Sequence, residues 1–337
     1  MRALVLTKRG TPDEALAVRE WPDPAVGQGQ VRIRVHAAGL NFADVLARVG
    51  LYPDAPKPPT VMGYEVAGEV ESVGPGADGF QPGKRVAAGT RFNGFAELAT
   101  ADVANVIGIG DGMSFEEAAA IPVVYGTAYA AVALLAAVRP GETVLVHAAA
   151  GGVGIAALQI LRDRGATVIG TASAAKHEAV RAQGAEHVID YRTQDVDAEV
   201  RRITGGRGVD AVLDPLGSFK ESYGLLRPGG RLVMYGASRL LTGDRRNVVN
   251  ALRTVVAMPR FNAIKLMNEN RSVMGLNLLH WWDERGSLEE VMEPLVDLLE
   301  RGVIKPVVAE TFPFERAADA HRYIQERRNV GKVVLTS

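Results

Sequence analysis

The chain has 337 residues, no cysteine and a formal net charge of −1 at pH 7. This length predicts about two domains, and the hydrophobic and charged fractions, 47% and 23%, are those of an ordinary globular protein. The near-zero charge offers no general attraction for nucleic acid or an anionic membrane, and the lack of cysteine excludes disulfides, thiolate zinc sites, iron–sulfur ligation and cysteine nucleophiles.

Two segments bear on export and membrane insertion. The apolar run between Arg2 and Lys8 is too short for a signal-peptide core, so we expect a cytoplasmic protein. The uncharged run over residues 118–138 has the length of a membrane span, but Pro122 and Gly126 interrupt it and alanine, a weak inserter, dominates it. We interpret this run as a buried helix between two domains.

The first third of the chain has the pattern of an antiparallel β-domain. Short valine-containing runs are separated by glycine and proline, and residues 75–78 and 81–84 are typical of tight turns. The expected strands lie at 31–35, 66–73, 85–87 and 94–99.

From Thr143 onward, strands alternate with helices. The strands are continuous apolar runs, which is typical of a parallel sheet covered by helices on both faces. We expect strands at 142–149, 167–172, 187–191, 209–217 and 230–237, and helices at 153–164, 176–183 and 196–203. This segment is predicted to be a doubly wound nucleotide-binding domain.

The remaining residues predict a return to the first domain. After a loop and helical stretch at 239–265, the pattern indicates a strand at 272–278, helices at 288–301 and 315–328, and a closing strand at 333–337. A closing strand needs a sheet edge to join, and the β-domain offers one. The predicted division is 1–122 for the first part of the β-domain, 123–265 for the nucleotide-binding domain and 266–337 for the return, with a last parallel-sheet strand near 271–278.

A glycine loop follows the first strand of the nucleotide-binding domain. The pattern A-x-G-x-x-G runs from Ala149 through Gly151, Gly152 and Val153 to Gly154, and a helix follows. Glycine lets the backbone approach a pyrophosphate, and the helix amino terminus supplies N–H donors and a partial positive charge. This context favours dinucleotide binding over a structural turn.

The end of the next strand indicates which dinucleotide is bound. An NAD site places Asp or Glu about 20 residues after the glycines, to bind the ribose 2′-hydroxyl. Residues 171–176 contain no acid there and offer the Ser173 hydroxyl and the Lys176 ammonium instead. We therefore expect NADPH rather than NADH, the alternative being that Lys176 simply begins a solvated helix.

Several longer motifs carry a family resemblance. They are GLNFADVLARVGLYP (39–53), MGYEVAGEVESVG (62–74), PGKRVA (82–87), HAAAGGVG (147–154) and NVGKVVL (329–335). They resemble the zinc-free quinone oxidoreductase branch of the medium-chain dehydrogenase/reductase superfamily, and residues 236–247 and the NVGK ending are similar to its synaptic-vesicle amine-transport-protein-like members. The resemblance implies an α/β protein: a GroES-like β-rich catalytic domain with an inserted Rossmann doubly wound parallel-sheet domain. It also implies a homodimer joined through Rossmann edges.

The resemblance also implies a site without metal. By this resemblance, Gly63-Tyr64-Glu65 matches the motif G-H-E of the zinc alcohol dehydrogenases, in which the histidine binds the catalytic zinc. The six histidines show no ligand spacing such as H-E-x-x-H. We therefore expect no metal site.

Site residues follow from the same resemblance. Asn41 is implied as the donor to the substrate oxygen, with Tyr52 and Tyr64 lining the pocket, while Asp44 is left as structural. From the residues alone, Asn41 also reads as a turn residue and Tyr52 as a loop aromatic packed on prolines. The implied cofactor contacts outside the glycine loop are Thr127 at the nicotinamide, Gly236, and Ser173, Lys176, Tyr191 and Arg327 at the 2′-phosphate.

Without zinc, an electron-poor acceptor needs the least activation, so we expect NADPH-dependent reduction of quinones or α,β-unsaturated carbonyls by hydride transfer. The alternative is an NADPH-binding regulatory or membrane-associated protein with little activity. It rests on residues 239–271, which hold seven basic and two acidic residues interleaved with apolar ones. We prefer a helix covering the substrate mouth, so peripheral membrane contact is less favoured, and no nucleic-acid partner is expected.

Overall fold

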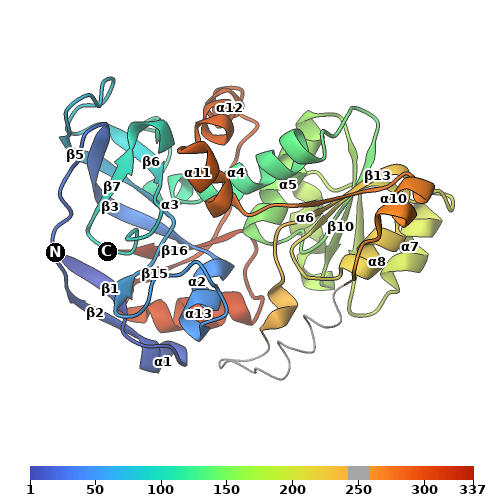
Figure 1. Cartoon of the computed structure of the whole chain (residues 1–337), viewed down its shortest axis with the longest axis horizontal. Coiled ribbons are helices and arrows are strands. Elements are labelled where there is room, and N and C mark those ends of the chain that lie inside the picture. Colours follow the sequence, from blue (N-terminus) through green and yellow to red (C-terminus); the bar gives the residue numbers. More distant parts are fainter. Residues whose placement is uncertain (242–258) are drawn as a thin grey trace.

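A computed structural model of the chain describes residues 1–241 and 259–337. It consists of two lobes, a β-rich lobe that holds both termini and an α/β lobe beside it (Figure 1). The α/β lobe is inserted between the early and the last strands of the β-rich lobe, as the sequence predicted.

The β-rich lobe contains a seven-stranded sheet with the order β15-β16-β3-β5-β6-β8, and β7 also pairs with β3. Its central strand β3 alternates buried and outward residues, with Val31, Ile33 and Val35 in the core between arginines. The strands are β3 (Gln30–Leu40), β5 (Glu65–Val73), β6 (Arg85–Gly89), β7 (Leu98–Asp102), β8 (Val106–Gly108), β15 (Val308–Pro313) and β16 (Lys332–Thr336). A small sheet joins β1 (Arg2–Leu6), β2 (Leu16–Glu20) and β4 (Thr60–Val61).

Two expectations for this lobe need correction. The expected strand at 94–99 starts only at Leu98, because the backbone N–H of Phe95 bonds to Met62 instead of entering the ladder. The sheet is also not wholly antiparallel, since β15 and β16 are parallel. Helix α13 (Ala317–Gln325) connects these two strands, and such a crossover produces a parallel pair.

The α/β lobe is a six-stranded sheet with the order β11-β10-β9-β12-β13-β14, in which every pair is parallel. The strands are β9 (Thr143–Val146), β10 (Thr167–Ala172), β11 (His187–Asp190), β12 (Val209–Asp214), β13 (Leu226–Met234) and β14 (Ser272–Gly275). The helices are α5 (Gly152–Asp163), α6 (His177–Ala182), α7 (Val196–Ile203), α8 (Phe219–Gly224) and α10 (Ala263–Glu269). The strand order reverses beside β9, and ligands of such sheets bind at this reversal.

Strand β14 lies within the expected range but ends earlier, at Gly275. The Asn277 side chain accepts the backbone N–H groups of Leu279 and His280, so it caps helix α11 (Leu278–Arg285) and stops the strand. Helix α12 (Glu289–Glu300) follows and packs on α4 (Pro122–Tyr129) and on β8, which connects the two lobes.

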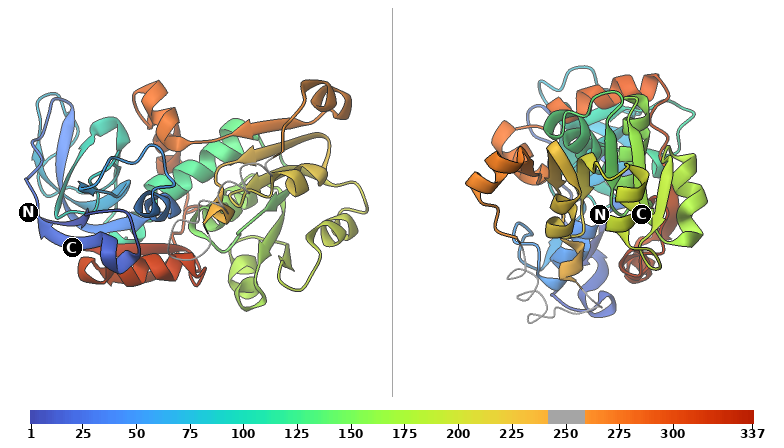
Figure 2. Two further views of the ribbon diagram at one scale, coloured as in Figure 1. Left: turned by 60° about the horizontal axis from the view of Figure 1, so that its bottom comes forward. Right: turned by 90° about the vertical axis from the view of Figure 1, so that its right-hand side faces the viewer.

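The uncharged run is helical and lies between the lobes (Figure 2). It overlaps a helical segment made of α3 (Phe115–Ala118), α4 (Pro122–Tyr129) and a π-helix (Ala130–Leu135), and by length and composition this segment could cross a membrane. However, 72% of its most apolar window is buried inside the protein. Its residues belong to the same core as β9 and α5, so the run has the position of a core helix.

Two further α-helices in the described part of the chain are α1 (Pro12–Ala15) and α2 (Phe42–Val49). Helix α2 begins at the end of β3, and Asn41 is its N-cap. This geometry places Asn41 between the end of β3 and the start of α2.

Candidate active site

The glycine loop lies between β9 and α5, where the parallel sheet changes direction. A Cβ atom at Gly154 would lie 2.5 Å from the carbonyl oxygen of Ala148, so only glycine lets the helix start this close to the strand. At Gly152 a Cβ would lie 3.0 Å from the side chain of Val124 in α4. These close approaches fit the backbone cradle that a dinucleotide diphosphate requires.

The loop is joined to the β-rich lobe at its base. The backbone N–H of Gly331 bonds to the carbonyl of Ala150 at 2.9 Å, and Gly331 forms a parallel bridge with Gly151. Gly331 has φ +93°, and a side chain there would collide with the carbonyl oxygen of Val307. The start of β16 is therefore held against the glycine loop.

The next residue, Lys332, forms a buried ion pair that the sequence analysis missed. Its Nζ lies 2.5 Å from Oε1 of Glu65, and the two side chains are 4% and 0% exposed. Oε2 of Glu65 accepts the backbone N–H of Val123 in the first turn of α4 at 2.7 Å. Both residues occur in the quoted motifs, but nothing in a single sequence pairs them.

Asn41 belongs to this cluster, and its side chain is fully used there. Its Nδ2 donates to the carbonyl of Gly39 at 3.2 Å and to Oε1 of Glu65 at 3.0 Å, while its Oδ1 accepts from Nζ of Lys332. An amide has two hydrogens, so none is left for a substrate oxygen. In this structure the Asn41 side chain holds Glu65 and Lys332 in place, and its expected role as donor to a substrate oxygen stays a prediction.

Asp44, left as structural, connects two turns of the site. Its carboxylate accepts the backbone N–H of Asn41 at 2.8 Å and that of Gly63 at 3.2 Å. Burial raises the pKa of this carboxyl to about 7. Asp44 thereby fixes the backbone immediately before Tyr64.

Tyr52 and Tyr64 meet edge to face, with ring centroids 6.2 Å apart, and Phe92 packs on Tyr64 at 5.3 Å. Burial and the carboxylate of Asp54 raise the pKa of the Tyr52 hydroxyl to about 12, and burial raises the pKa of Tyr64 further. The Tyr64 hydroxyl is buried and has no hydrogen-bond partner among the residues that the structure describes. The two expected pocket residues are therefore brought together.

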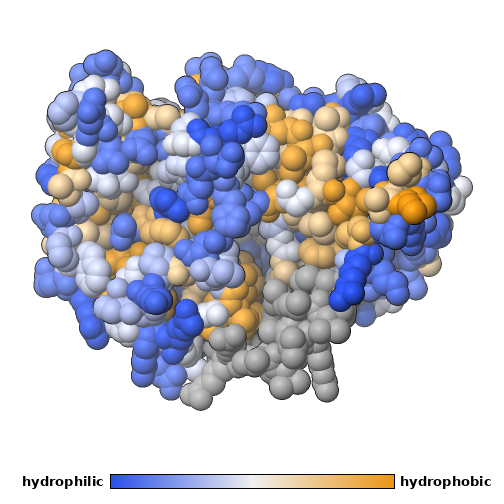
Figure 3. Space-filling view, viewed as in Figure 1, coloured by the Kyte–Doolittle hydropathy of each residue, from blue (hydrophilic) through white to orange (hydrophobic). Residues whose placement is uncertain are grey.

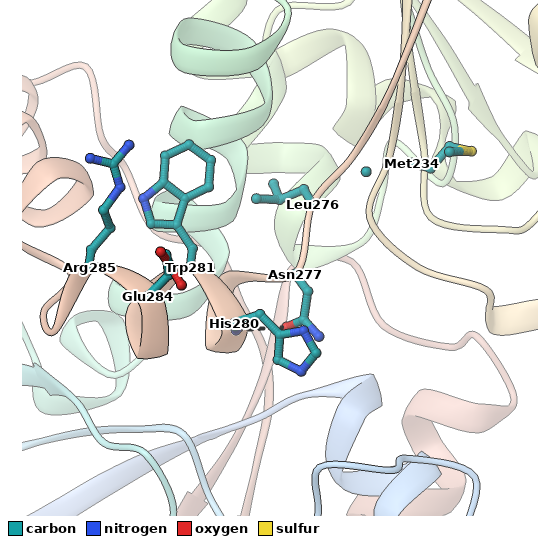
Figure 4. A pocket seen from close by; sticks show the side chains of 8 residues that line it. Met234, Leu276, Asn277, His280, Trp281, Glu284 and Arg285 are labelled. Carbon is teal, nitrogen blue, oxygen red and sulfur yellow. Dashed lines mark hydrogen bonds between the residues drawn. The ribbon is translucent and has the colours of Figure 1, made fainter. Parts of the chain in front are cut away.

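A cavity of about 620 Å³ opens between the end of the parallel sheet and α11 (Figure 4). Its lining includes Met234, Leu276 and Trp281 as apolar surface and Asn277, Glu284 and Arg285 as polar surface. Asn277 also faces the Tyr52 hydroxyl. Asn277 thus lies between the cavity and Tyr52.

Two polar contacts join α11 to loops of the β-rich lobe beside the cavity. The Nε2 atom of His280 lies 2.9 Å from Oδ1 of Asp54, and Nη2 of Arg91 lies 2.9 Å from Oδ2 of Asp283. In each contact, α11 meets a loop of the β-rich lobe.

The expected phosphate-binding residues gather at the carboxyl end of β10. Ser173 is buried there, and Nζ of Lys176 donates to the carbonyls of Arg327 and Asn329, each at 2.7 Å. Burial, helped by the cations of Arg192 and Arg327, lowers the pKa of Lys176. Lys176 is therefore anchored to the loop before β16, with one ammonium hydrogen left for a ligand.

Arg192 was not expected in this group. Its guanidinium lies 6.0 Å from the ring centroid of Tyr191, which is exposed, and it acts electrostatically on Lys176. The sequence offered one signal for Arg192, namely that it directly follows Tyr191, an expected phosphate-binding residue.

The other two expected cofactor residues, Thr127 and Gly236, lie on α4 and shortly after β13. Thr127 is buried on α4, and Gly236 follows β13, where a Cβ would lie 2.8 Å from the carbonyl oxygen of Pro215. Among the described residues, no group of three or more His, Asp or Glu side chains could hold a metal ion.

Family models for the "Alcohol dehydrogenase GroES-like domain" and the "Zinc-binding dehydrogenase" match residues 27–133 and 183–335. The synaptic vesicle membrane protein VAT-1 homolog of Homo sapiens is 43% identical over 99% of this chain and 86% of its own length.

Among solved structures, the CurK enoyl reductase superposes with TM-score 0.86 at 30% identity, covering 99% of this chain and 98% of that one. A mycobacterial protein complexed with NADPH gives 0.85 at 31% identity, with both chains covered completely. A quinone oxidoreductase of Pseudomonas syringae pv. Tomato gives 0.84 at 31% identity, covering 100% and 99%.

Proposed function

The chain belongs to the medium-chain dehydrogenase/reductase superfamily and to its VAT-1 homolog group, and from this membership we propose an NADPH-dependent reductase of quinones or α,β-unsaturated carbonyls. The observation that carries the proposal is the glycine loop between β9 and α5, at the point where the strand order of the parallel sheet reverses and ligands of such sheets bind. The NADPH complex, the enoyl reductase and the quinone oxidoreductase among the structural relatives support it.

The described residues fit NADPH in two places. The backbone of Gly151 to Gly154 and the first turn of α5 would hold the diphosphate, because the glycines leave no side chain in its way. Ser173, Tyr191 and the cations of Lys176, Arg192 and Arg327 would hold the 2′-phosphate. When bound, NADPH supplies the hydride.

The cavity is the proposed position of the acceptor. Met234, Leu276 and Trp281 would cover the apolar part of a quinone or enone, and this contact excludes water. Tyr52 and Asn277 would then border its oxygen-bearing end.

The proposed reaction needs no zinc. The chain has no cysteine, and Tyr64 stands where zinc enzymes of this superfamily have a histidine ligand. The tyrosine ring is packed between Tyr52 and Phe92, so hydrogen-bond donors rather than a Lewis acid would stabilise charge on the substrate. Stoichiometric zinc in active enzyme, with activity lost on chelation, would contradict this.

The second candidate is an NADPH-binding protein that associates with a membrane and has little activity. It is favoured by the name of the vesicle membrane relatives and by α10, where Ile264 and Met267 are 67% and 74% exposed. Much of the basic stretch 239–271, including Arg245, Arg246 and Arg253, lies outside the described residues. We prefer the cytoplasmic reductase because the site is complete enough to hold both cofactor and acceptor.

One set of assays separates the two candidates. NADPH oxidation at 340 nm is measured with 1,4-benzoquinone, 2-cyclohexen-1-one and hexanal as acceptors, and NADPH binding is measured by fluorescence. The reductase predicts acceptor-dependent oxidation with the first two acceptors. Tight NADPH binding without oxidation, together with flotation on vesicles containing anionic lipid, would favour the second candidate.

A further inference from the structure

Helix α4 packs against both halves of the candidate site. A Cβ atom at Gly152 in the glycine loop would lie 3.0 Å from the side chain of Val124, in the first turn of α4. A Cβ atom at Gly126 in the same helix would lie 3.6 Å from the side chain of Leu278, the first residue of α11. Because α11 carries one wall of the cavity, α4 connects the glycine loop to that wall.

The first turn of α4 is capped from another strand. The N-cap residue of α4, Ile121, makes no side-chain hydrogen bond to the helix. Instead, Oε2 of Glu65 at the start of β5 accepts the backbone N–H of Val123 at 2.7 Å. A carboxylate at this end satisfies a first-turn donor and interacts favourably with the helix dipole. Glu65 therefore fixes the position at which α4 begins.

Lys332 joins the same carboxylate to the glycine loop. Its Nζ lies 2.5 Å from Oε1 of Glu65, and a Cβ atom at Gly152 would lie 3.7 Å from its Cδ. The side chain therefore passes the glycine loop before its ammonium reaches Glu65. The preceding residue, Gly331, is bonded to the loop through Ala150. The glycine loop and α4 are thus both held by the ion pair.

The ion pair has little room to shift. The Lys332 and Glu65 side chains are almost fully buried, and Asn41 bonds to both of them. A Cβ atom at Gly39 would lie 2.6 Å from Oε1 of Glu65 and 2.7 Å from Cε of Lys332, so the backbone closes on the pair from the side of β3. The connection between the two halves of the site is therefore stiff.

We infer that Lys332 and Glu65 are positioning residues, which set the distance between the bound cofactor and the acceptor by fixing α4 against the glycine loop. This inference rests on the proposed function. Both residues are buried outside the lining of the cavity, so they act through α4 and β16. Hydride transfer needs the reacting atoms about 3–3.5 Å apart, and a misplacement of about 1 Å can lower the rate about 10²-fold.

The test variant is Lys332→Met/Glu65→Gln, which removes both charges at similar side-chain volume and should keep the fold. The matched control is Arg231→Met/Glu142→Gln. This second ion pair is also largely shielded, with side chains 17% and 14% exposed, but it joins β13 to the residue before β9 and makes no link between the lobes.

A second variant, Glu65→Asp, keeps the charge beside Lys332. Its side chain is too short to reach both the ammonium and the N–H of Val123, so it loosens the connection without leaving a buried charge unpaired. It decides the test if the double variant does not fold.

Single-turnover kinetics separate positioning from stability. Protein saturated with NADPH is mixed with excess 2-cyclohexen-1-one, and the absorbance at 340 nm is followed by stopped flow. Partial unfolding lowers the amplitude of the decay and leaves its rate constant unchanged, whereas misplacement lowers the rate constant itself. The rate constant should fall about 10–100-fold in Lys332→Met/Glu65→Gln, fall less in Glu65→Asp and stay unchanged in the control.

Two further measurements identify the affected step. NADPH carrying deuterium at C4 should slow the decay in the double variant, because hydride transfer is then the step observed. The Kd for NADPH should stay close to that of the wild type, because the glycine loop is intact.

Three results would overturn the inference while leaving the proposed function in place. They are rate constants in the variants indistinguishable from that of the wild type, an equal decrease in the control, and a decrease without a deuterium effect. A wild type that binds NADPH but does not oxidise it with this acceptor or with 1,4-benzoquinone would overturn the proposed function, and the inference with it.

Discussion

Lys332 and Glu65, which are far apart in the sequence, meet as a buried ion pair with Nζ 2.5 Å from Oε1. Asn41 and the first turn of α4 complete the set of hydrogen bonds around it. The pair therefore connects the first residue of β16 to the first residue of β5, beside Asn41.

Removing one charge of this pair should lower the free energy of unfolding. Lys332→Ala would leave the Glu65 carboxylate buried without a counter-charge, and such a loss typically costs about 3–5 kcal/mol. Urea denaturation should show this decrease in the free energy of unfolding. The double variant Lys332→Met/Glu65→Gln should recover much of it, while Arg91→Ala, at an exposed pair, should cost about 1 kcal/mol or less. Equal unfolding midpoints for Lys332→Ala and the wild type would contradict this role.

NADPH selectivity should depend on Arg192 as well as on Lys176. A hydrogen bond to a charged group contributes roughly 1.5–3 kcal/mol, so Arg192→Ala should weaken NADPH binding about tenfold or more. NADH affinity should change little, because NADH lacks the 2′-phosphate. Fluorescence titration measures both, with Arg201→Ala on the exposed face of α7 as the control. Equal Kd values of the wild type for NADPH and NADH would refute the phosphate site itself.

His321 should make the fold sensitive to acid. Burial, together with the cation of Arg48, lowers the pKa of this imidazole from 6.5 to about 3, so the folded state keeps it neutral. The unfolded chain binds a proton near pH 6.5, hence stability is present above this pH and is lost as the pH falls toward 3. The loss approaches about 1.4 kcal/mol per pH unit. His321→Leu should flatten the decline between pH 6 and 4, and His187→Leu, at an exposed site, should not.

A homodimer through the α/β lobe remains a prediction. Strand β14 is at the edge of the parallel sheet, and apolar side chains gather on this lobe in Figure 3, including those at α10. Light scattering should give twice the chain mass of 35.9 kDa. The variant Ile264→Glu/Met267→Glu should weaken association, whereas Val296→Glu, an exposed apolar position on α12, should not. A monomeric mass at micromolar concentration would exclude the dimer.

The sequence predicted the elements whose signals are local. Helix α7 has the predicted bounds 196–203, and the glycine loop follows its strand as expected, because periodicity and turn chemistry act over a few residues. The ion pair of Lys332 and Glu65 was not predictable in this way, since it depends on two segments that only the folded chain brings together.

The role of Asn41 illustrates the same limit. A motif specifies which residue occupies a position but not which of its hydrogens are already bonded, and here Glu65 and Gly39 use both. Arg192 was missed for a different reason, which is its residue type. An arginine after a strand is ordinarily solvated, and only the folded chain shows that Arg192 lies close enough to Lys176 to act on its charge.

The bridge between Gly151 and Gly331 determines how the lobes can move. Because it joins the lobes at the glycine loop, a rotation about this point is the lobe motion that leaves the bridge intact. Such a rotation displaces the far rim most, where the exposed contacts of His280 with Asp54 and of Arg91 with Asp283 are easily broken. We expect the proposed acceptor cavity to open more readily than the proposed 2′-phosphate site, so that product leaves while the dinucleotide stays bound.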